Sequence, residues 1–194
     1  MSRVGRKPVA IPAGVQVNIQ GCSVKVKGPL GELQVALPAA IKAEKQGDAI
    51  VLSADLAAGE NVSALYGMAR ARVANIVAGV CREFAKNLEI HGLGFKATLE
   101  GENKLVFNIG RSHPVPFDLP KGIKAGLDKK ATKLEIKGID KDLVGQTVAR
   151  IRALRPPEPY KGTGIRLAGE RIIRKAGKTA AGVGGGPAAG PAKK

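Results

Sequence analysis

ALPAAIKA, residues 36–43, returns later in the chain as DLPKGIKA, residues 118–125, a shift of 82 positions. Two further pairs repeat in the same order at nearly the same shift: KVKG (25–28) with FNIG (107–110), and ARAR (69–72) with ARIR (149–152). Because order and spacing agree across all three pairs, they indicate an internal duplication.

The duplication predicts two tandem domains and a tail. We expect an N-terminal domain with a basic arm over residues 1–82 and a second domain over residues 83–175. Residues 176–194 are rich in Gly, Ala and Pro. Such a composition buries too little apolar area to offset the entropy cost of ordering, so we predict a flexible tail.

The first copy shows strand-like alternation followed by one helical pattern. Alternating polar and apolar residues predict strands at residues 15–19, 22–28, 32–37 and 49–54. Apolar residues at helical spacing then share one face: Val62, Leu65, Tyr66, Ala69, Val73, Ile76, Val77 and Val80. The first copy therefore reads as a sheet covered by one helix.

The second copy repeats this scheme. Strands are predicted at residues 95–101, 104–110, 123–127 and 132–138. Asp140 is a suitable N-cap for the helix that follows, and Pro156 should end it because the residue before a proline avoids helical geometry. The helix stripe comprises Leu143, Val144, Thr147, Val148, Ile151 and Leu154. We predict an α+β fold of two duplicated domains, each a mostly antiparallel sheet packed against one helix.

The net positive charge of the chain favours a negatively charged partner. The 194 residues include 32 Lys and Arg but 16 Asp and Glu, a formal net charge of +16. Such an excess favours a polyanion. No run of 18 apolar residues is present and the first residues lack the apolar core of a secretion signal, which predicts a cytoplasmic protein. An anionic membrane surface is the competing polyanion, but residues 155–178 lack a regular apolar stripe and any Trp or Phe.

Motifs of catalysis are weak. GLGFKA (92–97) fits a dinucleotide fingerprint, yet strand-like alternation follows where a helix is required, which favours turn glycines. Cys22 and Cys81 belong to no CxxC pair. His91 and His113 have no carboxylate or nucleophile partner evident by spacing, so an enzyme using either as a base is the rival hypothesis. We predict no catalytic residue, no metal and no cofactor.

The most basic stretch is RPPEPYKGTGIRLAGERIIRKAGK, residues 155–178. Residues 150–178 hold nine Lys and Arg against Glu158 and Glu170. Three prolines at positions 156, 157 and 159 stiffen the chain and reduce the entropy lost on binding.

Side chains next to these prolines suit phosphate. Gly162 and Gly164 remove side chains where a phosphate backbone could approach, Tyr160 offers a ring, and Lys161 and Arg166 supply charge. The pattern predicts a preformed anion-binding loop that reads the shape and phosphates of folded RNA rather than base sequence.

PPEPYKGTGIR (156–166) strongly resembles the C-terminal motif of the bacterial large-subunit ribosomal protein L6 family. Further segments resemble the same family in the expected order: MSRVGRKPVAIPAGVQVNIQG, VKVKGPLGEL, LEIHGLGFKA, GRSHPV, LPKGI and DKDLVGQTVARIRALRPPEPYKG. The resemblance spans residues 2–178. It implies a structural, non-enzymatic constituent of the large subunit, bound to 23S rRNA near the stalk base and the factor-binding region.

The resemblance also implies partners and contacts. Expected partners are 23S rRNA and neighbouring large-subunit proteins near the stalk base, with no membrane and no homo-oligomer. The resemblance assigns RNA contact to Tyr160, Lys161, Gly162, Gly164 and Arg166. The full predicted RNA-contact set adds basic and polar residues elsewhere: Arg3, Arg6, Lys7, Arg111, Ser112, His113, Arg155, Thr163, Arg171, Arg174, Lys175 and Lys178.

Three positions depart from the family pattern. Thr163 stands where the family usually has Lys, and Leu167 where an aromatic is usual. Arg111 stands where Tyr is common. Thr163 therefore removes one charge from the loop, and Arg111 adds one elsewhere.

Overall fold

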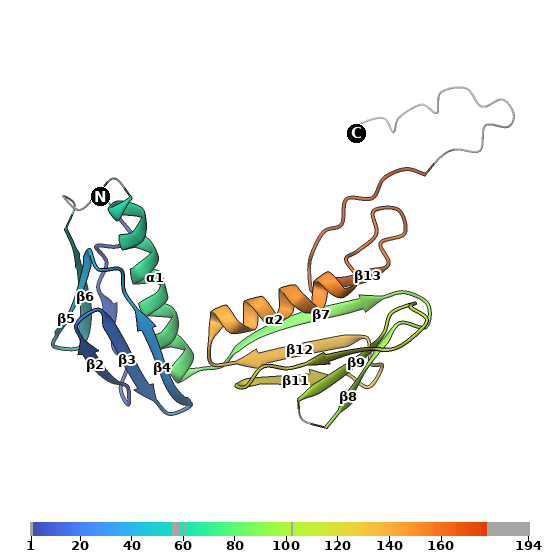
Figure 1. Cartoon of the computed structure of the whole chain (residues 1–194), viewed down its shortest axis with the longest axis horizontal. Helices are drawn as coiled ribbons and strands as arrows, with labels where there is room; N and C mark the ends of the chain where they lie inside the picture. Colours follow the sequence, from blue (N-terminus) through green and yellow to red (C-terminus); the bar gives the residue numbers. More distant parts are fainter. Residues whose placement is uncertain (1, 56–58, 60, 102, 178–194) are drawn as a thin grey trace, which may run out of the picture.

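The computed structural model describes residues 2–55, 59, 61–101 and 103–177. The predicted flexible tail lies almost wholly outside these residues, since only positions 176 and 177 of it are described. The chain folds as two α+β units arranged one after the other along the long axis (Figure 1). Among the described residues, no helix combines the length and apolarity needed to cross a membrane.

The first unit contains two small antiparallel sheets and one helix. Its elements are β1 (Val9–Ala10), β2 (Gln16–Gln20), β3 (Ser23–Gly28), β4 (Gly31–Ala36), β5 (Ile41–Gln46), β6 (Ala49–Ala54) and α1 (Val62–Cys81). The sheet orders are β2-β3-β4 and β1-β6-β5. On β3, Val24 and Val26 are buried while Lys27 is exposed, so strand alternation directs one face into the core.

Helix α1 covers this core as its periodicity predicts. Every residue of the predicted stripe is buried except Leu65, which is half-buried. Tyr66 is the only tyrosine on the helix, and its hydroxyl donates to the Leu52 carbonyl at 2.8 Å. This bond ties α1 to β6 while the ring stays in the core.

The second unit has the same plan with one addition. Its elements are β7 (Phe84–His91), β8 (Lys96–Glu100), β9 (Lys104–Asn108), β10 (Val115–Asp118), β11 (Ile123–Leu127), β12 (Lys133–Gly138), α2 (Lys141–Leu154) and β13 (Gly164–Leu167). The orders are β10-β9-β8 and β11-β12-β7-β13, and every pairing is antiparallel.

Comparing the two units confirms the duplicated α+β fold. The orders β1-β6-β5 and β2-β3-β4 correspond to β7-β12-β11 and β8-β9-β10, and each unit has one helix. The prediction was one sheet for each helix, whereas in the structure each helix packs into a core formed with two sheets. Strand β13 has no counterpart in the described part of the first unit.

Strands β1, β5, β7, β10 and β13 were not among the predicted strands. Their alternation is weak or short: β5 carries Lys42 and three consecutive exposed residues, and β1 has only two residues. Strand β13 lies within residues 155–178, where no strand was predicted. Its four residues acquire strand structure from pairing with distant β7, which a local pattern does not reveal.

Helix α2 begins and ends as predicted. The Asp140 carboxylate accepts a bond from the backbone N of Asp142 at 2.9 Å, which is an N-cap. The helix ends at Leu154, two residues before Pro156. Its buried residues Val148 and Ile151 share a core with Phe107 of β9. The C-terminal end of α2 is thereby fixed over the sheet.

The two units touch where α1 ends and α2 begins (Figure 1). Lys141 Nζ donates to Asn75 Oδ1 at 3.2 Å and lies 5.8 Å from the centre of the Phe84 ring. Gly79 of α1 faces the Ile139 carbonyl so closely that no side chain fits between them. A short connection and a tight backbone contact therefore join the units.

Candidate nucleic-acid interface

Strand β13 brings the basic stretch to the edge of the second unit's larger sheet. Gly164 pairs with His91, Ile165 with Ile90 and Arg166 with Glu89. Ile165 is fully buried, which anchors the strand in the core. The residues before and after β13 consequently lie at the end of the unit that is remote from the first unit (Figure 1).

Backbone hydrogen bonds close the proline-rich loop. Glu158 N donates to Thr163 O at 2.9 Å, and Gly162 N donates to Glu158 O at 2.9 Å. Further along, Lys175 N donates to Pro159 O at 2.9 Å, so the chain returns to the loop after β13. These bonds fix the loop before any partner arrives, as the prolines predict.

The two loop glycines are required by this closure. Gly162 has a φ of +72° and Gly164 one of +138°, values that favour glycine. A Cβ on Gly164 would lie 2.7 Å from the Pro156 carbonyl oxygen, and one on Gly162 would lie 3.3 Å from the Arg174 guanidinium. Both residues are buried, so the space beside them is filled by the chain itself rather than left open for phosphate.

Tyr160 and Lys161 stand at the outer side of the loop. Tyr160 is 54% exposed and Lys161 is exposed. In the part of the chain that the structure describes, Lys161 forms no ion pair. The Thr163 hydroxyl donates to a Glu158 carboxylate oxygen at 3.1 Å. Thr163, which departs from the family pattern, therefore forms a hydrogen bond within the loop instead of adding a charge to it.

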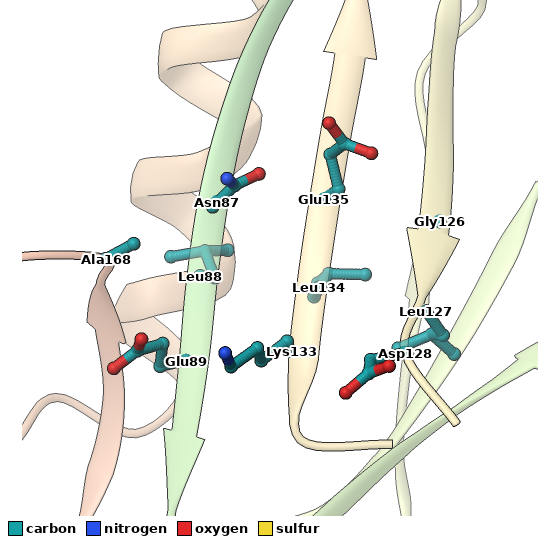
Figure 2. Close-up of a pocket in the computed structure, with 10 residues that line it drawn as sticks. All are labelled: Asn87, Leu88, Glu89, Gly126, Leu127, Asp128, Lys133, Leu134, Glu135 and Ala168. Atoms are coloured by element: carbon teal, nitrogen blue, oxygen red, sulfur yellow. The ribbon is translucent and has the colours of Figure 1, made fainter. Parts of the chain in front are cut away.

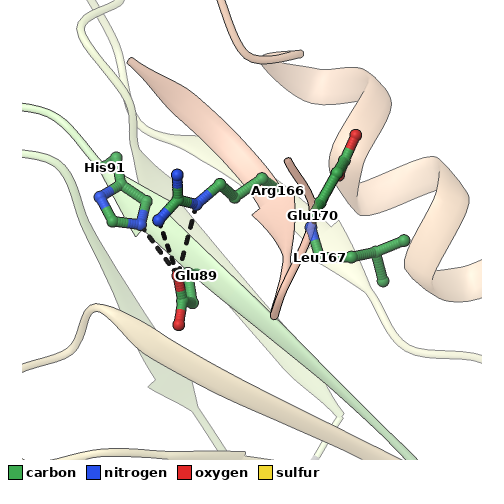
Figure 3. Close-up of polar contacts among 5 residues, drawn as sticks. All are labelled: Glu89, His91, Arg166, Leu167 and Glu170. Atoms are coloured by element: carbon green, nitrogen blue, oxygen red, sulfur yellow. Dashed lines mark hydrogen bonds and ion pairs between the residues drawn. The ribbon is translucent and has the colours of Figure 1, made fainter. Parts of the chain in front are cut away.

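Arg166 is held by an acid rather than left free. Its Nη2 donates to Glu89 Oε2 at 3.1 Å and its Nε donates at 3.3 Å (Figure 3). His91 Nε2 lies 3.0 Å from the same oxygen. The hydrogen bonds from His91 and Arg166 lower the pKa of Glu89 below its ordinary value, against a smaller opposing effect of burial. A phosphate at Arg166 would therefore compete with Glu89.

A second carboxylate secures the far end of β13. Glu170 accepts from Arg152 Nε of α2 at 3.2 Å and from the backbone N of Leu167 at 3.0 Å. The Arg152 hydrogen bond and then the Leu167 bond lower the pKa of Glu170. Figure 3 shows Glu170 beside Leu167 at the end of the strand. Arg152 and Glu170 both lie in the basic stretch 150–178, but their spacing in the sequence did not predict that they would pair.

Two predicted contact residues, Arg111 and Arg155, lie at the C-terminal end of α2. Arg111 Nη2 donates to the Leu154 carbonyl at 3.1 Å, where the helix exposes unpaired carbonyls and negative dipole charge. Arg155 lies 5.8 Å from the centre of the Phe95 ring, a cation–π arrangement. Ser112 and His113 follow Arg111 and are exposed.

The cations after β13 stay on the surface. Arg171, Arg174 and Lys175 are exposed and form no ion pair among the described residues. Lys178 lies outside the described residues. We use the term basic end for the exposed and half-buried group formed by Arg111, Arg155, Tyr160, Lys161, Arg166, Arg171, Arg174 and Lys175.

The basic arm is elsewhere. Arg3, Arg6 and Lys7 are exposed beside α1, where Arg70 donates to the carbonyls of Lys7 at 3.2 Å and Pro8 at 3.4 Å. The arm lies beside α1 of the first unit, whereas β13 lies in the second unit, farther along the long axis (Figure 1). The structure therefore does not bring the arm and the basic end together into one surface.

A hollow of about 450 Å³ lies on the open face of the second unit's larger sheet and shares Glu89 with the Arg166 pair (Figure 2). Its charged lining comprises Glu89, Asp128, Glu135 and Lys133. The hollow is thus more acidic than the basic end and is unsuited to a polyanion. Among the described residues, no three His, Cys, Asp or Glu side chains are grouped as metal ligands.

Comparison with known proteins identifies the family. The sequence profile of the family described as ribosomal protein L6 matches residues 11–82 and 91–167. The large ribosomal subunit protein uL6 of Koribacter versatilis (strain Ellin345) is 48% identical over 181 residues, which cover 93% of this chain and 99% of the relative. That of Desulfatibacillum aliphaticivorans is also 48% identical, over 93% of this chain and 100% of the relative.

A cyanobacterial relative agrees. The large ribosomal subunit protein uL6 of Synechococcus sp. (strain JA-3-3Ab) is 46% identical over 92% of this chain and 97% of the relative. The matched segments span both units and the loop that precedes β13. The chain belongs to the ribosomal protein L6 family, whose members are structural proteins of the ribosome and not enzymes.

Proposed function

We propose that this protein is a structural constituent of the large ribosomal subunit that binds 23S rRNA through the basic end. The observation that carries the proposal is a loop closed by its own backbone bonds that presents Tyr160 and Lys161 outward. Arg174 and Lys175 return to this loop and form no ion pair among the described residues. A preformed cationic loop loses little conformational entropy on binding.

The basic end recognises phosphate and shape. Lys161, Arg171 and Lys175 neutralise backbone phosphates and release counterions. Tyr160, more than half exposed, packs on a ribose or base, as aromatic side chains do in RNA complexes. Gly162 and Gly164 shape the loop, and Arg166 can exchange Glu89 for a phosphate. The second unit thereby holds rRNA helices in one mutual arrangement without reacting with them.

The placement in the subunit and the domain division are parts of the same proposal. We place the protein in the cytoplasmic ribosome near the stalk base and factor-binding region, beside other large-subunit proteins, on the family resemblance stated above. We divide the chain into domains at residues 82 and 83. The two-residue connection between Cys81 and Phe84 supports that boundary.

Salt-dependent RNA binding tests the basic end. The full chain is titrated with transcribed 23S rRNA at several salt concentrations, for the wild type and for the double variant Lys161→Ala, Arg171→Ala. The slope of log K against log salt is negative, and each lost phosphate contact reduces its magnitude by about 0.7–0.9, so the double variant should reduce that magnitude by about 1.5. Affinity should fall in parallel.

A charge-matched variant controls for the loss of net charge. Lys27 and Lys45 are exposed on strands of the first unit, so Lys27→Ala, Lys45→Ala removes the same charge at a distance from the basic end. The control should keep the wild-type slope. Equal affinities and slopes for the two double variants would refute the assignment of the basic end.

A further inference from the structure

The turn between β7 and β8 presents a leucine that the described chain leaves uncovered. Leu93 is 101% exposed, more than any other large apolar side chain among the described residues. Single exposed apolar residues are common on protein surfaces. Leu93 differs because its turn packs on the Phe95 ring, and the same ring carries the Arg155 guanidinium.

The turn is anchored from beneath by an aromatic ring. Phe95 N donates to Gly92 O at 3.3 Å. Cβ atoms on Gly92 and Gly110 would lie 2.6 Å and 2.8 Å from the Phe95 ring, so the ring packs directly against both backbones. Gly92 and Gly94 have φ values of +152° and +71°, which glycine adopts without strain. The leucine side chain is therefore held outward on an ordered support.

The register of the sheet places this turn next to the basic end. Gly164 pairs with His91, so the turn that follows His91 begins at the same edge of the sheet where the loop carrying Lys161 ends. Arg155 stacks on the same Phe95 ring that supports the turn, at 5.8 Å from its centre. The apolar tip thus shares its aromatic support with a cation of the basic end.

Two acidic residues beside β13, Glu89 and Glu158, already have hydrogen-bond partners. Glu89 is bonded to Arg166 and His91, and Glu158 accepts from Thr163. The turn and the adjoining loop therefore combine one exposed apolar side chain with Arg155 and Lys161, which form no ion pair among the described residues. A nucleotide matches this pattern, because it carries the apolar face of a base or ribose and a phosphate on a single unit.

We propose that Leu93 is an apolar contact of the RNA interface, packing on an exposed base or ribose while Lys161 and Arg155 hold neighbouring phosphates. This inference rests on the proposed function. A lone leucine is too small to anchor a protein on a membrane, where stable binding needs more than one insertion signal. Charge complementarity therefore favours RNA as the occupant.

Substitution of an apolar contact and substitution of a cation have different effects on the salt dependence of RNA binding. Removing an apolar contact lowers affinity without changing the number of phosphates neutralised. Leu93→Ala should weaken binding by about 5–10-fold, as expected for the partial burial of the methine and two methyl groups that the substitution removes. The slope of log K against log salt should stay at the wild-type value.

The test is the same 23S rRNA titration with the full chain. Leu30, 41% exposed in the turn between β3 and β4, supplies the matched control Leu30→Ala. Leu93→Met, which keeps the apolar volume, should recover wild-type affinity. The unfolding midpoint of Leu93→Ala should equal that of the wild type, since the replaced side chain is exposed.

Each outcome decides a different claim. A wild type that does not bind the RNA refutes the proposed function and, with it, this inference. Wild-type binding with equal affinities for Leu93→Ala and Leu30→Ala overturns the inference alone. A flattened salt slope in Leu93→Ala also overturns it, because the turn would then act through charge. If the wild type bound vesicles containing phosphatidylserine and Leu93→Ala lost that binding while its RNA affinity stayed unchanged, the inference would be overturned and Leu93 would be assigned to a membrane contact.

Discussion

Two helical glycines with opposite surroundings provide a direct test of how the units are joined. Gly79 lies in the last turn of α1, and Gly145 lies within α2. A Cβ on Gly79 would come closer than 3.0 Å to the Ile139 carbonyl oxygen and 3.1 Å from the Phe84 ring, whereas a Cβ on Gly145 would meet nothing within 4 Å. We predict that Gly→Ala substitution has opposite signs at the two positions.

The expected magnitudes follow from two competing effects. Replacing a helical glycine by alanine stabilises the helix by up to about 1 kcal/mol, and Gly145→Ala should show this gain in full. Gly79→Ala has the same helical benefit but forces a methyl group against backbone, and overpacking costs about 1–3 kcal/mol. The two variants should therefore differ by about 1–3 kcal/mol in the free energy of unfolding.

Guanidinium unfolding of the full chain, followed by circular dichroism, measures this difference. Hydrogen–deuterium exchange at the start of α2 provides a local readout, because displacement of Ile139 also disturbs the bond between Lys141 and Asn75. Faster exchange there is expected only in Gly79→Ala. If Gly79→Ala stabilised the protein as much as Gly145→Ala, the close contact between the units would be refuted.

Two further substitutions test local bonds. Asp140→Ala should destabilise the protein by about 1 kcal/mol through loss of the N-cap, while Asp140→Asn, which keeps an accepting oxygen, should remain near the wild type in the same unfolding assay. Glu89→Gln should reduce stability at neutral pH, because a carboxylate with a lowered pKa stabilises the fold when ionised. Urea titrations at several pH values should show this difference shrinking as pH falls below the ordinary value of 4.5; a difference independent of pH would refute the pairing with Arg166.

Periodic and capped elements could be predicted from sequence because their determinants are local. The α1 stripe from Val62 to Val80 repeats an apolar face over five turns' worth of residues, and the signals that bound α2, Asp140 and Pro156, lie within two residues of its ends. Strand β13 could not be predicted in this way. Its residues GIRL contain a single apolar–polar–apolar step, Ile165 to Leu167, which is too short to predict a strand, and their structure depends on β7.

The composition of the basic end was readable from sequence, but the pairing of its charges was not. Arg166 and Glu89 are 77 positions apart, and only the register between β13 and β7 sets them opposite each other. Arg111 reaches the end of α2 across 43 positions. Such pairs are decided by tertiary structure, so a run of cations in sequence overstates the number that are free to bind phosphate.

The distribution of charge shows why the second unit, rather than the first, presents the main cationic surface. Residues 1–82 hold ten Lys and Arg against five acids, and residues 83–149 hold eleven against nine. The repeated plan is thus only mildly basic. The excess of nine over two lies in residues 150–178, around β13. Strand β13, which the first unit lacks among its described residues, also pairs with the edge of β7. It therefore completes the sheet of the second unit and fixes the neighbouring cations to a rigid edge of that sheet.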